Sequence, residues 1–293
     1  MNTPGNKFRD AIADNKPLMV VGAINAYCAK MAEKAGHKAL YLSGAGVANA
    51  SFGLPDLAIT TLNDVAEDSR RITQATNLPL LIDIDTGFGG AFSISRTIKE
   101  MIAADVAAVH IEDQVTQKRC GHRPNKSLVD KIEMTDRIKA AVDSRTDESF
   151  FIMARTDSYA SEGMQGAIDR CNEYISAGAD GLFLEAVSSL EDYKQLKDAL
   201  QVPLLANITE FGKTPLFSAQ ELASVGVDIM LFPLSAFRAM NKAAESVYID
   251  IAENGSQVNS VKKMQTRDEL YEYLNYHSFE QKLDELFKRK ETK

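Results

Sequence analysis

The sequence predicts a (β/α)8 TIM barrel, because eight short apolar runs alternate with helical patterns along its 293 residues. Most of the runs are apolar almost throughout, as strands buried on both faces of a parallel sheet should be. The chain length also suits a single barrel. The eight expected strands are residues 18–25, 39–44, 79–85, 107–112, 151–157, 181–186, 203–209 and 229–235.

The even-numbered strands share a way of beginning. Gly36, Gly178 and Gly226 precede the second, sixth and eighth expected strands, at the left-handed position that follows a helix. Before the fourth strand the equivalent segment is Ala103-Ala104-Asp105, without glycine. The rival fold is a doubly wound open sheet, and no G-x-G-x-x-G motif follows the first expected strand to support it.

The segment after the eighth strand is longer than a barrel needs. Residues 236–254 and 267–290 both read as helical, whereas one helix is enough to close a barrel. No linker composition divides the chain. We therefore expect residues 1–293 to form a single domain, with a C-terminal helical extension over about residues 236–293.

Composition argues against several classes of protein. The 33 basic and 41 acidic residues give a net charge of -8, which is unfavourable for nonspecific binding to nucleic acid. There is no apolar run long enough to span a membrane and no hydrophobic signal segment at the N-terminus. The cysteines, Cys28, Cys120 and Cys171, are odd in number and unevenly spaced, which favours a reducing cytoplasm over a disulfide framework.

Polar side chains gather at the carboxyl ends of the expected strands. The pairs Asp83/Asp85, His110/Glu112 and Arg155/Asp157 each have the i, i+2 spacing that places two residues on one face of a strand. In a barrel these ends meet at the C-terminal mouth, where active sites lie. One such pair alone would be explained by a structural salt bridge, but burying charges on so many strands would cost on the order of a few kcal/mol each. Further residues at these ends are Ser43, Gly44, Glu185, Asn207 and Thr209.

Asp83, Asp85 and Glu112 form a candidate metal site built from oxygen ligands. No cysteine or histidine spacing in the chain matches a zinc site. Carboxylate oxygens suit Mg²⁺, or alternatively Mn²⁺, with water and substrate filling the other octahedral positions. For Asp83 the alternative is a hydrogen bond to a metal-bound water.

Cys120 lies in the cationic segment Lys118-Arg119-Cys120-Gly121-His122, and neighbouring cations lower the pKa of a thiol. A zinc site would need partners that Cys120 and His122 alone do not supply. A buried inert thiol is the usual alternative, but this segment is too polar for a core. We therefore expect a surface loop that hinges over substrate and carries a thiol able to exchange a proton near neutral pH.

These motifs resemble the isocitrate lyase/phosphoenolpyruvate mutase superfamily, and the cysteine segment resembles its carbon–carbon lyase branch. The resemblance covers essentially the whole chain. It implies a barrel whose eighth helix is swapped between subunits, a homotetramer built as a dimer of swapped dimers, and a Mg²⁺ site at Asp83 and Asp85. The chain departs from the family pattern at Gly90-Ala91-Phe92, one residue shorter, and at Leu184, where proline is expected.

The resemblance also implies a reaction, the retro-aldol cleavage of 2-methylisocitrate to pyruvate and succinate in the methylcitrate cycle of propionate catabolism. It makes Cys120 the proton donor and Arg155 a clamp for the substrate, and it leaves Tyr41 and Glu112 as alternative bases. The implied substrate contacts are Ser43, Gly44, Gly121, His122, Glu185, Asn207, Thr209, Arg238 and Arg267, with Phe183, Leu231 and Pro233 beside the methyl group. Alternative readings are an isocitrate or dimethylmalate lyase, an oxaloacetate decarboxylase or phosphonomutase, and a non-catalytic barrel.

Overall fold

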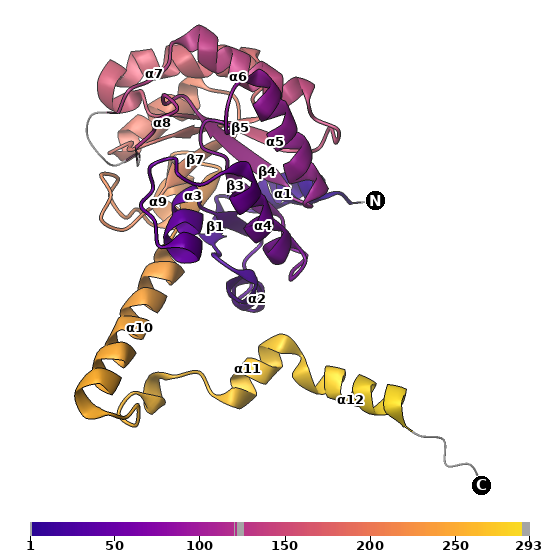
Figure 1. Cartoon of the computed structure of the whole chain (residues 1–293). Helices are drawn as coiled ribbons and strands as arrows, with labels where there is room; N and C mark the ends of the chain where they lie inside the picture. The colour runs from indigo at the N-terminus through magenta and orange to yellow at the C-terminus, as the bar shows by residue number, and fades with distance from the viewer. Residues whose placement is uncertain (1, 120, 122–125, 289–293) are drawn as a thin grey trace. The chain divides into compact units, whose positions relative to one another are not determined.

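The computed structural model describes residues 2–119, 121 and 126–288, and its first 237 residues form a closed barrel (Figure 1). Eight parallel strands follow one another in chain order, and β8 pairs with β1 to close the sheet. The predicted (β/α)8 TIM barrel is thereby confirmed. The strands are β1 (Leu18–Gly22), β2 (Ala39–Leu42), β3 (Leu80–Asp83), β4 (Ala108–Glu112), β5 (Phe151–Thr156), β6 (Gly181–Leu184), β7 (Leu204–Asn207) and β8 (Ile229–Phe232).

Seven of the strands end one to three residues earlier than their apolar runs predicted, and only β4 ends where it was expected to. The chain has to turn at the mouth of the barrel, and it does so directly after the last paired residue. Asp85 (φ 49°) and Ala186 (φ 64°) adopt left-handed backbone conformations that end strand pairing. The spacing predicted that Asp83 and Asp85 share one face of a strand. That prediction is wrong, because β3 ends at Asp83 and Asp85 lies in the turn.

Helices cover the outside of the barrel between successive strands (Figure 1). Three of them end at Gly36, Gly178 and Gly226, whose φ values of 93°, 102° and 82° confirm the predicted left-handed positions. Asp105 adopts the same conformation without glycine, at φ 56°. The helices of this unit are α1 (Pro4–Asp14), α2 (Ala26–Lys34), α3 (Gly44–Gly46), the π-helix η1 (Val47–Ser51), α4 (Leu62–Thr73), α5 (Ala91–Ala103), α6 (Lys131–Asp143), α7 (Tyr159–Ser176), α8 (Leu190–Ala199) and α9 (Ala219–Ser224).

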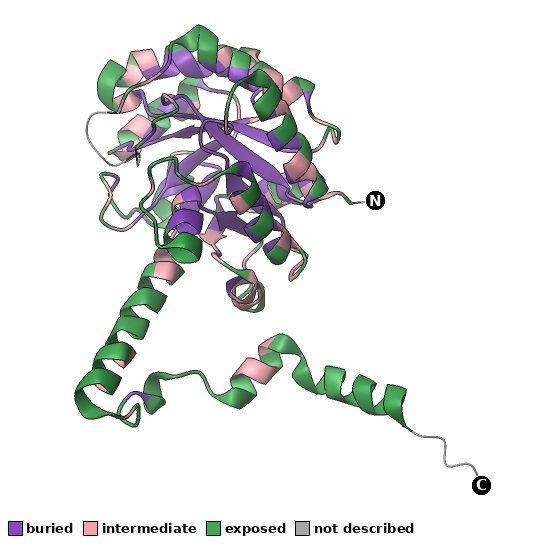
Figure 2. Cartoon of the chain, in the orientation of Figure 1, coloured by how far each residue is buried: buried purple, intermediate pink, exposed green. Residues whose placement is uncertain are grey.

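The core has two layers, one inside the barrel and one between the strands and the helices, and the strands between them are buried on both sides (Figure 2). The inner layer includes Phe8 and Ile12 of α1. This helix was not predicted from the sequence. The Phe8 ring lies edge-on to Phe151, with 5.4 Å between the ring centroids. Helix α1 therefore packs against the amino-terminal ends of the strands, opposite the polar mouth.

Residues Arg238–Lys293 form a second compact unit. Helix α10 (Ser235–Asn254) leads into it, and the 3-10 helix η2 (Val261–Lys263), α11 (Arg267–Leu274) and α12 (Tyr276–Phe287) follow. The continuous helix expected over residues 267–290 is wrong, because Asn275 adopts a left-handed conformation (φ 54°) that separates α11 from α12. That residues 1–293 act as one domain stays a prediction. Among the described helices, none is long and apolar enough to cross a lipid bilayer.

Candidate active site

The carboxyl ends of the strands form a buried, highly charged mouth. Strand pairing places Asp83 beside His110 and Glu112 beside Arg155. The predicted site residues in the described part of the barrel are all buried: Tyr41, Ser43, Gly44, Asp83, Asp85, Glu112, Gly121, Arg155, Phe183, Glu185, Asn207, Thr209, Leu231 and Pro233. Cys120 and His122 lie outside the described residues. Arg238 and Arg267 belong to the second unit, so their approach to a substrate stays a prediction.

Asp83 and Asp85 are joined by a tight turn after β3. The backbone N–H of Asp85 donates to Asp83 Oδ1 over 2.9 Å, and its carbonyl accepts from the N–H of Glu112. The backbone of Gly44 approaches the other oxygen, with its nitrogen 3.4 Å from Asp83 Oδ2. A β-carbon on Gly44 would lie 3.2 Å from both carboxylates. The glycine therefore leaves room beside the two acids.

Lys118 reaches this acid pair from the cysteine segment. Its Nζ lies 2.7 Å from Asp85 Oδ1 and 2.6 Å from Asp56 Oδ1. Burial opposes the charge on Lys118, but the surrounding carboxylates, led by Asp85 and Asp83, raise its pKa above the ordinary value. In the sequence, Lys118 stands out only as a cation next to Cys120, and no pattern singles out Asp56. The two residues are 62 positions apart, so nothing local indicates that they meet.

The two acids differ in how readily they ionise. Burial opposes ionisation of Asp83, but His110, Lys118 and Arg155 lower its pKa to about 2. Since His110 is itself neutral at neutral pH, Lys118 and Arg155 supply that stabilisation there. Burial and the negative charge of Asp83 raise the pKa of Asp85 to about 6, against the opposing effect of Lys118. Both acids are thus ionised at neutral pH.

Glu112 supports the presence of a cation at this site. It is fully buried, and burial raises its pKa well above the ordinary value in spite of Arg155 and Lys118. Its Oε2 lies 3.3 Å from Arg155 Nε, but neither carboxyl oxygen has a hydrogen-bond partner among the described residues. A buried oxygen without a donor is costly, and a metal-bound water would satisfy it.

The described acids, histidines and cysteines include no group of three placed to hold a metal ion without further ligands. Mg²⁺ does not require one, because it commonly keeps several waters and uses one or two carboxylates together with oxygens of the substrate. The residues present therefore fit a hydrated Mg²⁺ held by one or two of these acids.

Arg155 is held by acids on three sides. Its Nε lies 3.0 Å from Asp157 Oδ2, and its Nη2 lies 3.1 Å from Glu185 Oε2. The guanidinium carbon lies 4.9 Å from the centre of the Phe183 ring. Asn207 Nδ2 donates to Glu185 over 3.3 Å, which extends the cluster to β7. Arg155 is thus a fixed, charged group at the centre of the mouth.

Tyr41 lies below this layer and is paired with His110. The phenol oxygen lies 2.9 Å from His110 Nε2, and the two rings are stacked. Burial lowers the pKa of His110 to about 4, so the imidazole is neutral at neutral pH. Burial, with the added charge of Asp83, raises the pKa of Tyr41 well above 10. The phenol therefore stays protonated, and its hydroxyl shares a hydrogen bond with His110 Nε2.

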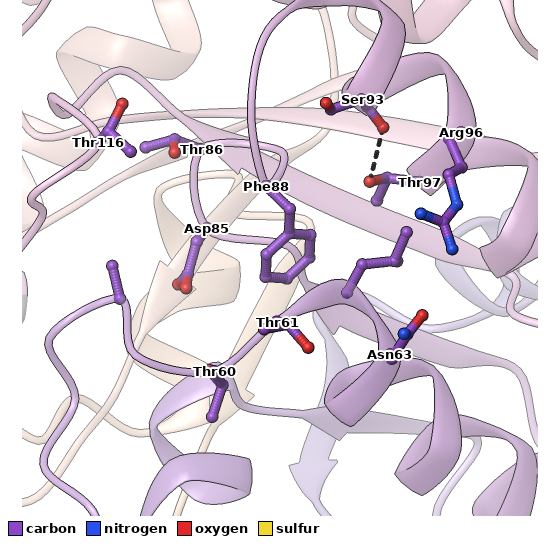
Figure 3. A pocket seen from close by; sticks show the side chains of 12 residues that line it. Thr60, Thr61, Asn63, Asp85, Thr86, Phe88, Ser93, Arg96, Thr97 and Thr116 are labelled. Atoms are coloured by element: carbon purple, nitrogen blue, oxygen red, sulfur yellow. Dashed lines mark hydrogen bonds between the residues drawn. The ribbon is translucent and has the colours of Figure 1, made fainter.

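A pocket of about 430 Å³ adjoins the acid pair (Figure 3). The Asp85 carboxylate and the Phe88 ring point toward Thr60 and Thr61, while Arg96 lies at the other side of the space. The pocket reaches Asp85 from the side of α4 and α5. Its lining consists of Ala58, Thr60, Thr61, Leu62, Asn63, Asp85, Thr86, Phe88, Ser93, Arg96, Thr97 and Thr116.

Comparison with curated sequences supports the resemblance seen in the motifs. The 2-methylisocitrate lyase of Vibrio cholerae is 61% identical over 291 residues, which cover 97% of this chain and 94% of the relative. The 2-methylisocitrate lyase of Salmonella typhimurium is 57% identical over 293 residues, covering 100% of this chain and 99% of the relative.

Solved structures agree with the same family. The crystal structure of 2,3-dimethylmalate lyase, a PEP mutase/isocitrate lyase superfamily member, has a TM-score of 0.89 at 34% identity and covers 98% of this chain and 96% of its own. Phosphonopyruvate hydrolase in complex with oxalate and Mg²⁺ has a TM-score of 0.85 at 25% identity, covering 98% and 100%. The family model for phosphoenolpyruvate phosphomutase matches residues 8–252. On this match and these identities, the chain belongs to the isocitrate lyase/phosphoenolpyruvate mutase superfamily.

Proposed function

We propose that this chain is a carbon–carbon lyase that cleaves 2-methylisocitrate into pyruvate and succinate. Two relatives that carry this activity in their names are 61% and 57% identical over nearly the whole chain. The observation that carries the proposal is the division of the mouth into two halves. Ionised acids from β3 lie beside Arg155 and the polar residues of β6 and β7, so one half suits a cation and the other suits carboxylates.

The cation is Mg²⁺, for which Mn²⁺ would substitute. Asp83 and Asp85 would hold it directly or through water, and the buried carboxyl oxygens of Glu112 would be available to a metal-bound water. A divalent ion held by these residues would lower the pKa of the substrate hydroxyl and stabilise the ketone that forms. The complex of phosphonopyruvate hydrolase with oxalate and Mg²⁺ supports the choice of metal.

Cleavage begins when a base removes the proton of the substrate hydroxyl. The carbon–carbon bond next to the hydroxyl-bearing carbon then breaks, and its electron pair passes to the succinyl fragment as an aci-carboxylate. Of the two candidate bases, Glu112 fits better, because its carboxylate lies beside Arg155 at the mouth, whereas the Tyr41 hydroxyl is already paired with His110. The raised pKa of Tyr41 keeps that phenol protonated.

Cys120 then protonates the carbanion, which gives succinate, while the pyruvate fragment keeps the methyl group. Arg155 binds the carboxylate of the pyruvate half, because its guanidinium is held in place by Glu112, Asp157 and Glu185. Residues proposed for the carboxylates of the succinyl half are Glu185, Asn207, Thr209 and Arg238. Further proposed substrate contacts are Ser43, Gly44, Gly121, His122 and Arg267.

Phe183, Leu231 and Pro233 set the preference for a methylated substrate. Phe183 and Leu231 belong to the same apolar layer inside the barrel. One methyl group in a shaped apolar pocket is worth about 1–3 kcal/mol, or roughly tenfold to two-hundredfold in selectivity. That range is enough to favour 2-methylisocitrate over isocitrate.

The protein works as a homotetramer of helix-swapped dimers in the cytoplasm, in the methylcitrate cycle of propionate catabolism. None of the described residues of α10 is buried. The barrel unit carries an apolar groove of about 490 Å³, which a helix from a second copy would cover. The groove is lined by Met19, Val21, Gly22, Cys28, Met31, Ala32, Ala35, His37, Phe232, Ser235 and Ala236.

A coupled assay for the oxo-acid product tests the proposed activity, with glyoxylate followed for isocitrate and pyruvate for the other substrates. The purified protein with Mg²⁺ is given 2-methylisocitrate, isocitrate, 2,3-dimethylmalate or oxaloacetate in parallel. We expect the highest kcat/KM with 2-methylisocitrate, with succinate formed in equal amount. A preference for any of the other three substrates would replace the proposal by that activity.

A further inference from the structure

The carboxylate of Asp157, directly after β5, is shared by two buried cations. Its Oδ2 lies 3.0 Å from Arg155 Nε, and its Oδ1 lies 2.5 Å from Lys126 Nζ. Burial opposes the charge on Asp157, but Arg155 and Lys126 lower its pKa below the ordinary value. The three groups therefore form a buried chain of alternating charge.

Lys126 makes a second contact, with the backbone of the cysteine segment. Its Nζ donates to the carbonyl oxygen of Gly121 over 2.6 Å. Gly121 in turn lies against the guanidinium of Arg155 and the carboxylate of Glu185, so closely that a β-carbon would not fit. One ammonium group thus links the residue after Cys120 to the acid that orients Arg155.

The position of Asp157 is fixed by contacts other than the one with Lys126. Its backbone N–H donates to Asp113 Oδ1 over 3.0 Å. Asp113 is fully buried, and its Oδ2 accepts from Thr156 Oγ1 at 2.6 Å and from the Tyr174 hydroxyl at 2.9 Å. Asp157 is therefore a fixed point to which Lys126 ties the cysteine segment.

The two ends of the cysteine segment are held together by backbone hydrogen bonds and do not need the ion pair of Lys126. Gln114 and Leu128 already form an antiparallel bridge there. The N–H of Val115 donates to the carbonyl of Ser127 over 3.0 Å, and the N–H of Val129 donates to that of Asp113 over 2.9 Å. Removing Lys126 leaves Arg155 as the cation for Asp157, so the buried carboxylate is not left without a partner.

We infer that Lys126 is a positioning residue for the lyase reaction. It holds the Gly121 backbone against Arg155 and Glu185 and, through Asp157, fixes the guanidinium at the same time. This assignment rests on the proposed function for its kinetic consequence, because the groups that it aligns are the proposed proton donor segment and substrate clamp. A shift of about 1 Å in such groups costs roughly a hundredfold in rate.

The test compares Lys126→Met, which keeps most of the length of the side chain but removes its ammonium group, with the matched control Lys139→Met. Lys139 lies on α6 and is exposed, with Nζ 3.8 Å from Asp136. For Lys126→Met we expect kcat to fall about a hundredfold, with a much smaller change in KM and in the melting temperature. Lys126→Arg restores the charge and should recover part of kcat, while Lys139→Met should behave as the wild type.

A double-mutant cycle identifies the route of the effect. If Lys126 acts through Asp157, combining Lys126→Met with Asp157→Asn lowers kcat by less than the product of the two single losses. Independent losses that multiply would overturn the link through Asp157. A kcat of Lys126→Met within about threefold of the wild type would overturn the positioning role itself.

Hydrogen–deuterium exchange separates this inference from the proposed function, because it needs no substrate. We expect faster exchange in Lys126→Met than in the wild type for a peptide spanning residues 115–127, with other peptides unchanged. Equal exchange in the two proteins would overturn the inference even if the wild type cleaves 2-methylisocitrate. Faster exchange in a protein without any lyase activity would keep the Lys126 contact and reject only the proposed function.

Discussion

A β-carbon placed on Gly121 would lie 2.4 Å from Nη2 of Arg155. The same atom would lie 2.7 Å from Oε2 of Glu185. Arg155 and Glu185 would have to move to admit any side chain at this position, because the backbone of Gly121 lies directly against them. The segment that carries the cysteine meets the strand ends at this point, which makes the contact sensitive to one added carbon.

Gly121→Ala should lower kcat strongly. Arg155 would have to move away from Asp157 or Glu185 to admit the methyl group, and a displacement of about 1 Å costs roughly a hundredfold in rate. Gly90→Ala is the control, because no atom lies within 4 Å of a β-carbon there. Steady-state kinetics with 2-methylisocitrate measure the effect, and equal activity of the two variants would contradict the contact.

Metal affinity should depend on pH through Asp85. Its pKa is raised to about 6, so below that pH the proton competes with the cation. We expect the affinity for Mn²⁺, followed by electron paramagnetic resonance after EDTA treatment, to fall about tenfold per pH unit below 6 and to level off above it. Asp85→Asn should bind weakly at every pH, and full lyase activity after thorough chelation would exclude a metal role.

The raised pKa of Asp85 also makes the free energy of unfolding depend on pH. Because the folded-state pKa of Asp85 lies above the ordinary value of 3.8, its contribution is present at low pH and is lost as pH rises through about 6. Asp83, with a pKa of about 2, acts in the opposite sense, and its contribution is lost as pH falls below 3.8. Denaturant midpoints of Asp85→Asn and the wild type, measured without metal, should therefore diverge as pH rises from about 4 to 6 and differ by a constant amount above pH 6, with the variant more stable.

Apolar runs predicted the barrel well because strands buried on both faces leave a continuous signal in the sequence. The same runs could not define the strand ends. Asp85 and Ala186 continue the strand pattern in the sequence, but their left-handed conformations are set by the turn at the mouth. The acid pair was thus found, although its geometry is that of a turn.

Contacts between distant segments left no local pattern to read. Lys118 and Asp56 are 62 residues apart, and the pairing of Lys126 with Asp157 spans 31 residues. Asp56, Lys118 and Lys126 each resemble an ordinary surface charge, and Asp157 was predicted only as a strand-end acid, so only the fold identifies these pairings. Asn275 is similar, because one residue in a left-handed conformation divides a stretch whose composition is helical throughout.

Asp105→Gly should stabilise the barrel. Asp105 is exposed and adopts φ 56°, the conformation that glycine supplies before the second, sixth and eighth strands. Relieving a left-handed conformation of this kind gains about 0.5–1 kcal/mol. Thermal unfolding should show a small rise in Tm for Asp105→Gly and a small fall for Asp105→Ala, and an unchanged or reversed order would refute this account.

Cys120→Ser should abolish turnover while the protein stays folded. A serine hydroxyl keeps the shape of the thiol but is far too weak an acid to protonate the carbanion, so we expect kcat to fall by orders of magnitude. Cys28→Ser is the comparison, since Cys28 is a thiol buried in the core. That variant should lose stability but keep its kcat, and near-normal turnover of Cys120→Ser would refute the proton-donor role.

Removal of the chain after Ser235 should cause aggregation and not yield a soluble active barrel. The groove beside Met19, Cys28 and Phe232 would have no helix to cover it, and uncovered apolar surface drives self-association. Light scattering on the intact protein should give a mass near a multiple of 32.2 kDa, with four copies expected.

A matched variant, Met240→Asp on α10, should weaken the assembly without changing the barrel, because Met240 is one of the exposed apolar residues of that helix. A fully active monomer at micromolar concentration would contradict the swap.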